Sequence, residues 1–217
     1  MMNAGSILGV AYRRTPAVQQ RLDAQRDSIA SAAVALLTAH GYRGLSIAAV
    51  AESAGVATGT VYRHFTDKSD LMVRVFREQC SREVDAVDAV ASTGSAAERV
   101  ARVVETFALR ALRKPTLAYA LLAEPVDAAV DAERLVFRRA FARAFADAIR
   151  VGVTTGELPP QNPDLVAAAL VGAVGEVLTG PLSAGETSTT TVPDLVTLAL
   201  RAVGSDPVLD RHEGASS

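Results

Sequence analysis

The sequence predicts an all-α protein of about nine helices, with a small N-terminal three-helix domain and a larger C-terminal helical domain. Apolar residues recur three and four positions apart along most of the 217 residues, which is the period of a helix, and no convincing segment shows the alternation of a strand. Glycine, proline and helix-capping residues interrupt this periodicity at short intervals. The chain is therefore predicted to be a succession of helices joined by turns.

The small domain is predicted over residues 21–67, after a flexible basic arm at residues 1–20 that shows little periodicity. Gly41 supplies a C-terminal cap for the first helix, Ser46 stands at the N-cap of a second, and Gly55 closes that helix after about two turns. The predicted helices cover residues 26–40, 47–54 and 58–65. Two short helices separated by a glycine turn thus follow a longer one, which is the helix-turn-helix arrangement.

The larger domain is predicted over residues 68–204 and begins with a linking helix at 68–90. Pro115 and Pro125 do not fit inside a helix, so they separate the helices that follow. These helices are expected at residues 96–113, 116–123, 127–152, 163–179 and 193–203. We expect the polar tail, residues 205–217, to be disordered.

The composition is that of a globular protein, with 49% apolar and 21% charged residues. Cys80 is the single cysteine and cannot form an internal disulfide, and no N-terminal segment has the pattern of a signal peptide, so a cytoplasmic location is expected. The apolar run at residues 165–178 is too short for a membrane span and contains Glu176. No membrane partner is expected.

The formal net charge of -2 conceals an asymmetry along the chain. Residues 1–80 hold nine Lys and Arg against six Asp and Glu, whereas residues 81–217 hold thirteen against eighteen. Binding to a polyanion normally requires a basic surface. Only the N-terminal third of the chain is therefore suited to DNA.

The short helix at residues 58–65 has an inner and an outer face. Val61 and Phe65 share one side of a helical wheel, which predicts that this side is buried. The opposite side carries small or hydrogen-bonding residues, namely Gly59, Thr60, Arg63 and His64. Such a face fits a DNA major groove, which is about 12 Å wide. Tyr62 on the flank, and Lys68 at the start of the next helix, are placed to reach phosphates.

These residues occur within a longer pattern that resembles the TetR family of repressors over about residues 26–75. The resemblance is carried by Gly41-Tyr42-Arg43-Gly44-Leu45-Ser46-Ile47, Val50-Ala51, Ala54-Gly55-Val56, Gly59-Thr60-Val61-Tyr62-Arg63-His64-Phe65, Lys68 and Leu71. It implies a helix-turn-helix that binds a double-stranded DNA operator and a C-terminal domain that binds a ligand and dimerises. By position, it implies base reading by Thr58, Thr60 and Arg63, and backbone contacts by Ser46, Tyr62, His64 and Lys68.

Two departures from the family pattern affect this assignment. Ala57 stands where many members have a polar cap, so Thr58 is expected either to read a base or to cap the helix. Ala48 replaces a longer polar side chain in the second helix. Arg63 thus becomes the main candidate for sequence discrimination, toward a guanine edge. Taken singly, each of these residues also has a structural interpretation; the two arginines of the arm, Arg13 and Arg14, are either minor-groove contacts or a solvated tail.

A dimer is expected because DNA half-sites are symmetric. Small residues along the helix at 163–179 allow close helix approach, and the last helix completes a four-helix dimer bundle. The expected interface residues are Ala168, Val171, Gly172, Gly175, Leu195, Leu198 and Ala202. The alternative is that these residues pack inside one subunit.

A small hydrophobic effector, such as an acyl-CoA, a fatty acid, an aromatic compound or a drug, is expected in the larger domain, with no cofactor. The candidate lining residues are Phe107, Arg110, Tyr119, Glu124, Phe137, Arg138 and Phe141. Arginines favour an anionic head group. The alternative is that the aromatic residues are plain core. The expected mechanism is a ligand-induced tilt of the linking helix that changes the separation of paired recognition helices and releases the operator.

An enzyme is not expected, because the chain has no phosphate-binding glycine loop, no nucleophile elbow and no metal-ligand spacing among its three histidines. The rival interpretation is a helical ligand-binding or adaptor protein whose DNA binding is weak or lost, which Ala48 and Ala57 allow. A steep salt dependence of DNA affinity separates the two.

Overall fold

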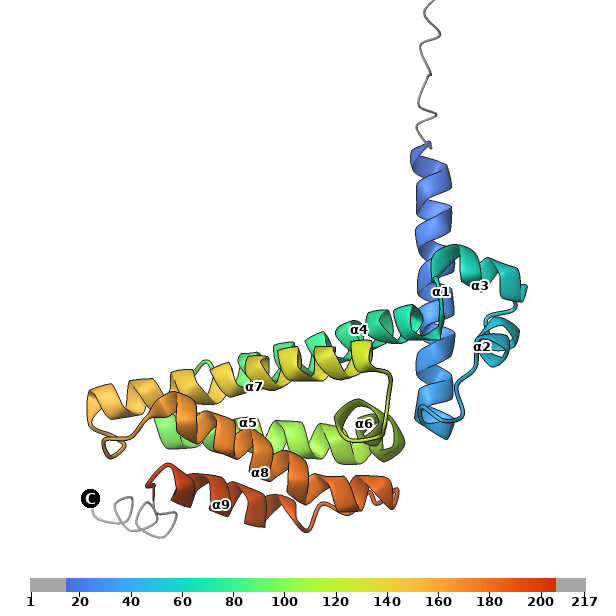
Figure 1. Cartoon of the computed structure of the whole chain (residues 1–217). Helices are drawn as coiled ribbons and strands as arrows, with labels where there is room; N and C mark the ends of the chain where they lie inside the picture. Colours follow the sequence, from blue (N-terminus) through green and yellow to red (C-terminus); the bar gives the residue numbers. More distant parts are fainter. Residues whose placement is uncertain (1–14, 206–217) are drawn as a thin grey trace, which may run out of the picture.

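The computed structural model describes residues 15–205, and within that range the chain forms nine α-helices and no strand (Figure 1). The predicted all-α fold is confirmed. The predictions that concern Arg13, Arg14 and the tail from residue 206 onward lie outside the described residues.

The N-terminal domain consists of α1 (Pro16–His40), α2 (Ile47–Ser53) and α3 (Thr58–His64). The prediction that the arm extends to residue 20 and that the first helix begins near residue 26 was wrong. Pro16 occupies the first turn of α1, where its fixed φ favours a helix, and the side chain of Gln19 donates to Asp23 one turn later. Because the first turns of α1 are mostly exposed, they carry no apolar periodicity.

The C-terminal domain contains six helices whose predicted bounds mostly agree with the structure. They are α4 (Lys68–Val90), α5 (Ala96–Arg113), α6 (Pro115–Leu122), α7 (Ala128–Thr155), α8 (Pro163–Ser183) and α9 (Val192–Ala202). Side-chain caps explain the agreement, since Asp67 accepts the N–H of Asp70 and Asn162 accepts the N–H of Asp164. The main difference is α8, which continues through Pro181 instead of ending near residue 179.

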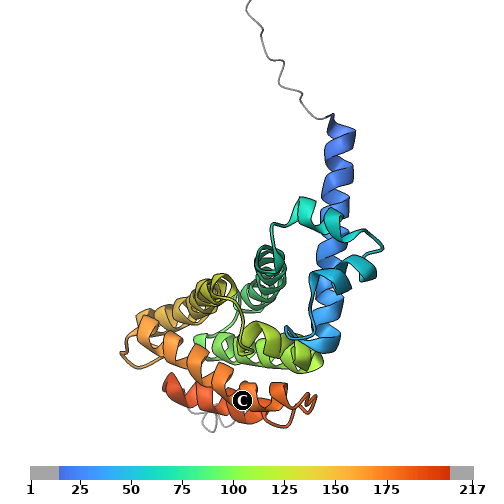
Figure 2. The same ribbon diagram turned by 45° about the vertical axis from the view of Figure 1, so that its right-hand side comes forward.

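The long helices lie side by side, and α1 stands across one end of them with α2 and α3 on its outer side (Figure 1). Turning the molecule shows that α4 leads from the N-terminal domain into the helical bundle, while α6 lies beside the C-terminal end of α1 (Figure 2). Two buried clusters hold these parts together. One joins α5, α7, α8 and α9, and the other joins the N-terminal domain to α4, α6 and the start of α7.

The helix α8 is apolar along most of its length but only 28% of its most apolar window is buried. By length and composition it alone among the described helices would suffice to cross a membrane. The sequence prediction of no such span rested on a shorter apolar run. Leu165 is 67% exposed and Leu198 on α9 is 45% exposed, so this side of the molecule is an apolar surface in the single subunit.

Candidate DNA-binding surface, ligand cavity and interdomain contact

The helix α3 is anchored by its inner face. Val61 and Phe65 are buried to within 1% of full burial in the core of the N-terminal domain, as the wheel predicted. Arg26 of α1 lies over the ring of Phe65, 5.2 Å from its centroid. The outer face is thereby fixed toward solvent, with Tyr62 53% exposed and Arg63 exposed.

The start of α3 has no side-chain cap, because Ala57 occupies the N-cap position. Thr58 is the first residue of the helix, so the expectation that it takes over capping was wrong. Its exposed position instead leaves the hydroxyl available for contacts outside the chain. A Cβ added to Gly59 would have no neighbouring atom within 4 Å, so this turn of α3 is open to a close approach.

Three other predicted DNA-binding residues, Ser46, His64 and Lys68, already have partners within the chain. Ser46 caps α2 by accepting the N–H of Ala49 at 3.1 Å. His64 is half-buried, and its Nε2 lies 3.0 Å from Oε1 of Gln25 in α1. Its pKa lies below the usual value, mainly because of burial and secondly because of the positive charge of Arg63. Lys68 is already engaged within the chain.

Lys68 binds Tyr42 in two ways. Its Nζ donates to the carbonyl oxygen of Tyr42 at 3.2 Å and lies 3.9 Å from the centroid of the same ring. The structure thus directs this charge toward the turn after α1, where it secures that turn to α4. The phosphate contact by Lys68 stays a prediction.

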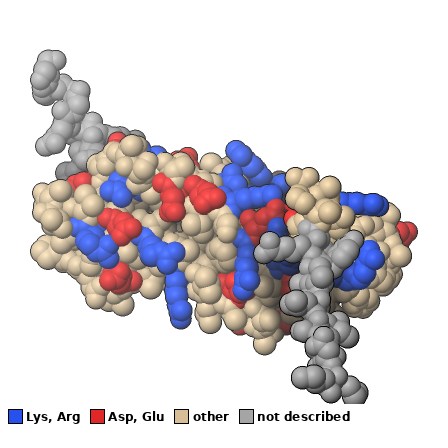
Figure 3. Space-filling model, turned by 90° about the horizontal axis from the view of Figure 1, so that it is seen from above, with Lys and Arg blue, Asp and Glu red and all other residues tan. Residues whose placement is uncertain are grey.

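Basic and acidic side chains alternate on the end of the molecule away from α3 in the space-filling view (Figure 3). Ion pairs contribute to this pattern, for example Arg150 with Asp147 at 2.6 Å and with Asp164 at 3.2 Å. Such paired surfaces offer no net attraction for a polyanion. Arg63 on α3 belongs to none of the described ion pairs.

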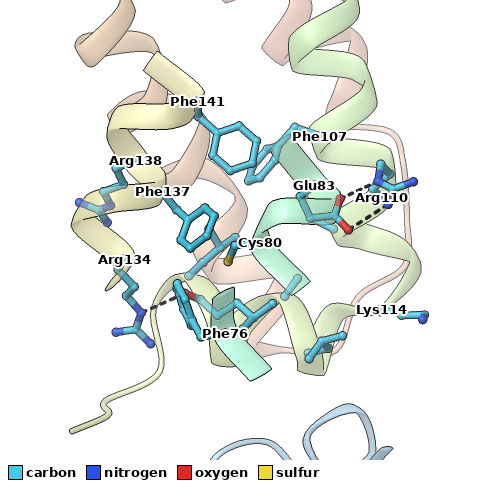
Figure 4. A pocket seen from close by; sticks show the side chains of 15 residues that line it. Phe76, Cys80, Glu83, Phe107, Arg110, Lys114, Arg134, Phe137, Arg138 and Phe141 are labelled. Carbon is cyan, nitrogen blue, oxygen red and sulfur yellow. Dashed lines mark hydrogen bonds and ion pairs between the residues drawn. The ribbon is translucent and has the colours of Figure 1, made fainter. Parts of the chain in front are cut away.

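A mainly apolar cavity of about 90 Å³ lies between α4, α5, α6 and α7 and opens partly to solvent (Figure 4). Of the predicted ligand-binding residues, five line it, namely Phe107, Arg110, Phe137, Arg138 and Phe141. Phe107 and Phe141 meet edge to face with centroids 5.0 Å apart, and Phe137 packs on Phe76 at 5.6 Å. The aromatic repeat on α7 is therefore a cavity wall as well as core.

A second, wider cavity of about 530 Å³ adjoins the first and shares Phe107, Leu122, Arg134, Arg138 and Phe141 with it. Its remaining wall comes mainly from α8 and includes the carboxylates Asp131 and Glu176. The two spaces differ in polarity, since the first is lined chiefly by aromatic and aliphatic side chains. Arg134 and Arg138 thus stand where an apolar space meets a more polar one.

Of the predicted ligand-binding residues, Arg110 lines the cavity but is already paired within the chain, and Tyr119 and Glu124 do not line it. Arg110 reaches the cavity, but Glu83 holds its guanidinium with two hydrogen bonds of 2.5 and 3.0 Å (Figure 4). Tyr119 packs against the core of the C-terminal domain. Glu124 is 6% exposed and lines neither cavity, because its carboxylate is turned toward the N-terminal domain.

Phe76, Cys80 and Arg134 are among the cavity residues that sequence reasoning missed. Phe76 and Cys80 lie on α4 one turn apart, so their spacing in the sequence could have indicated that they share one face of the helix. Burial raises the pKa of the Cys80 thiol, which keeps it protonated and apolar in character. Arg134 gave no sequence signal, because its partners are backbone carbonyls.

The carboxylate of Glu124 joins the two domains. It accepts the backbone N–H of Tyr42 at 2.8 Å and that of Arg43 at 3.2 Å, in the turn that follows α1. Gly41 in this turn has φ of +67°, and a Cβ there would lie 3.0 Å from Oε2 of Glu124. Successive N–H groups in such a turn form an anion-binding nest, here occupied by a side chain of the other domain.

The ring of Tyr42 adds a second link. Its hydroxyl donates to Asp127, which precedes α7, and this partner together with burial raises the pKa of the phenol. Residues 41–43 are therefore held from the C-terminal domain by two carboxylates and by Lys68 at the start of α4. We call this set, Tyr42, Arg43, Lys68, Glu124 and Asp127, the interdomain clamp.

The predicted dimer residues divide into three groups by their burial in the single subunit. Ala168, Gly172, Leu198 and Ala202 are exposed, and no described atom lies within 4 Å of a Cβ added at Gly172 or Gly175. Val171 and Gly175 are half-buried and, with Gly172, line the wider cavity. Leu195 is 2% exposed in the core of its own subunit, so it does not belong to this surface.

The model of the family described as bacterial regulatory proteins, tetR family, matches residues 29–75. The chain is also similar to the fatty acid metabolism regulator protein of Bacillus subtilis (strain 168), with 30% identity over 77 residues. That alignment spans 35% of this chain and 40% of the relative, so less than half of the relative's length is matched.

Two solved structures extend the likeness to the whole fold. The fatty acid degradation regulator FadR from Bacillus halodurans has a TM-score of 0.72 at 21% identity, covering 87% of this chain and 96% of that one. FadR from Bacillus subtilis, solved in complex with stearoyl-CoA, has a TM-score of 0.67 at 20% identity, covering 82% and 95%. The N-terminal domain thus matches the tetR family of bacterial regulatory proteins over residues 29–75, and the described chain shares the fold of these two regulators.

Proposed function

We propose that the chain is a transcriptional regulator, a repressor that binds a palindromic operator through α3 and leaves it when an amphiphilic ligand fills the cavity. The observation that carries the proposal is the combination of an anchored α3 with an exposed polar face and a cavity walled by α4, the helix that links the domains. Arg63 and Thr60 read bases, while Thr58, Gly59, Tyr62, Ser46 and His64 complete the contact surface.

The ligand class follows from the two adjoining cavities. The narrower one suits an apolar chain, and Arg134 and Arg138 at the junction suit an anionic group that extends into the wider one. The B. subtilis FadR structure holds stearoyl-CoA, which has this character. We infer a long-chain acyl-CoA or a related amphiphilic anion as the effector.

The dimer follows from the apolar surface of α8 and α9. Leu165, Ala168 and Leu198 are exposed in the single subunit, and a symmetric copy packed on this surface removes them from water. The same packing accounts for the low burial of the apolar helix α8. A protein located in the cytoplasm, with two copies of α3 facing successive major grooves, is the arrangement that this proposal requires.

The proposal is tested by selecting duplexes from a random library with the purified protein and measuring fluorescence anisotropy on the selected sequence with and without stearoyl-CoA. We expect a palindromic site, an affinity that falls steeply with salt concentration, and a loss of affinity when stearoyl-CoA is added. Equal affinity with and without stearoyl-CoA contradicts this ligand class. Failure to select any duplex favours the adaptor interpretation.

A further inference from the structure

Arg134 lines the cavity and also donates hydrogen bonds at the junction between the domains. Its Nε donates to the carbonyl of Leu121 at 2.9 Å, and its Nη2 donates to the carbonyls of Ala120 at 2.9 Å and Glu124 at 2.5 Å. It lines both cavities, and its side chain is only 11% exposed. Figure 4 shows it on α7 at the opposite side of the cavity from the Arg110–Glu83 pair.

These carbonyls belong to the end of α6 and the turn after it. The last four carbonyls of a helix have no partner within the helix, so a guanidinium that donates to two of them fixes the end of α6. The third carbonyl is that of Glu124 itself, whose carboxylate holds the N–H groups of Tyr42 and Arg43. A continuous series of hydrogen bonds thus runs from the cavity through Arg134 and Glu124 to the N-terminal domain.

Packing supports the same route. Leu117 and Leu121 of α6 line the cavity and also belong to the buried cluster that contains Leu37 of α1 and Val61 of α3. The helix α6 therefore separates the cavity from the DNA-binding domain, with one wall in common. A movement at the end of α6 therefore reaches the N-terminal domain directly, without passing through another described helix.

The alternative partner of Arg134 is an anion in the cavity. A hydrogen bond to an ionised group is roughly twice as strong as one to a neutral carbonyl. Burial lowers the pKa of the Arg134 guanidinium, because the charged form is partly removed from water. The same burial makes the attraction between the guanidinium and an anion stronger than it is in water. Asp131 contributes only a 3.4 Å contact to Nη1. The guanidinium is thus held mainly by neutral groups at a site where an anionic ligand is proposed to bind.

We propose that Arg134 is the positioning residue that reports ligand binding to the DNA-binding domain: the anionic group of the ligand draws its guanidinium from the carbonyls of α6 and Glu124, which loosens the interdomain clamp. This inference rests on the proposed function for the identity of the ligand, but the coupling of Arg134 to Tyr42 and Arg43 is a property of the chain alone.

The test measures amide hydrogen exchange at Tyr42 and Arg43 by NMR in the intact protein. In the absence of any ligand, Arg134→Met keeps the apolar stem but removes all donors, and Arg134→Lys keeps the charge but loses the planar fork. We expect exchange at these two amides to be roughly tenfold faster in both variants than in wild type, with amides of the α5 core such as Val100 unchanged. Unchanged exchange at Tyr42 and Arg43 overturns the inference.

Arg138→Met is the matched control, because Arg138 lines the same two cavities one turn further along α7 but donates none of the described hydrogen bonds to α6. This variant is expected to leave exchange at Tyr42 and Arg43 at the wild-type rate. Acceleration as large as in Arg134→Met would assign the effect to loss of positive charge in the cavity and overturn the specific role of Arg134.

A second arm adds saturating stearoyl-CoA. Wild type is expected to show the same roughly tenfold acceleration at Tyr42 and Arg43, whereas Arg134→Met, already loosened, shows no further change at saturation. If stearoyl-CoA binds wild type and lowers its DNA affinity without changing these amides, the proposed function stands and this inference falls. If the amides respond but DNA affinity does not change, the inference stands and the proposed release mechanism falls.

Discussion

At the scale of single residues, the outer face of α3 separates groups that are free from groups that are engaged. Tyr62 and Arg63 project into solvent, whereas His64 is tied to Gln25 and Lys68 to Tyr42. A sequence pattern names all four equally, because it cannot show which side chains already have partners. The free pair is where discrimination between DNA sequences is expected.

Arg63→Ala is expected to weaken binding to the selected operator by about 1–3 kcal/mol and to relax the preference at one base pair, since a bidentate contact to guanine is lost. Competition among operator variants, followed by anisotropy, measures both effects. Arg201→Ala, an exposed arginine at the end of α9, is the matched control. A uniform loss over all base-pair variants would make Arg63 a phosphate contact.

His64 predicts a pH dependence of stability. Because its pKa is lowered in the folded state, mainly by burial, the unfolded chain binds more protons between the folded pKa and the unfolded value of about 6.5. Stability therefore reaches its plateau above about pH 6.5 and falls as the pH drops below it. Thermal unfolding of wild type and His64→Gln at a series of pH values checks this, and the wild type should lose more stability on acidification. Parallel curves would contradict it.

At the scale of elements, the predicted and observed helix bounds agree where the residue that fixes the boundary lies next to it in the sequence. The starts of α2, α4 and α5 are marked by Ser46, Asp67 and Ser95, whose side chains accept N–H groups in the first turn. Local sequence contains this information. The end of α8 is different, because Leu182, which is 1% exposed, packs in the core and the helix continues through Pro181 to Ser183.

Gly59→Ala is expected to stabilise the fold by about 0.5–1 kcal/mol, because alanine favours a helix and its methyl group would meet no atom within 4 Å. The same methyl group stands on the face that approaches DNA, so operator affinity should fall. Urea unfolding and anisotropy measure the two quantities. Unchanged operator affinity in Gly59→Ala would mean that DNA does not approach this face of α3.

Ser46 combines capping of α2 with a predicted phosphate contact, and two substitutions separate these roles. Ser46→Ala removes the bond to the Ala49 N–H and should cost about 1 kcal/mol of stability. Ser46→Asp keeps a capping oxygen, so stability should be retained, while its charge repels a phosphate and weakens DNA binding. Denaturation and anisotropy of both variants provide the check. Tight operator binding by Ser46→Asp would remove Ser46 from the interface.

At the scale of the whole molecule, sequence reasoning predicted the succession of helices but missed the contact that joins the turn after α1 to the segment between α6 and α7. The interdomain clamp links Tyr42 to Glu124, which are 82 positions apart, through a backbone N–H that every residue possesses. Glu124 was instead expected in the cavity, because a charged residue near aromatic ones suggests a ligand anchor. Contacts of this kind depend on tertiary placement and leave no local pattern.

The exposed side of α8 predicts the oligomeric state. Ala168→Glu places a carboxylate on the apolar surface, where two copies meet in the proposed dimer, so the variant should sediment as a monomer at concentrations where wild type is a dimer. Analytical ultracentrifugation measures this. Ala89→Glu, an exposed alanine of α4, is the control. If Ala168→Glu remains dimeric, another surface carries the interface.

The common wall formed by α6 has a consequence for how such a protein diversifies. Leu117 and Leu121 belong to the cavity and to the DNA-binding core at once, whereas Phe107 and Phe141 line the cavity from α5 and α7. A substitution at the first pair alters ligand preference and operator occupancy together, and a substitution at the second pair alters ligand preference alone. New ligand specificities are therefore expected to arise by replacements on α5 and α7, while α6 stays under the joint selection of both domains.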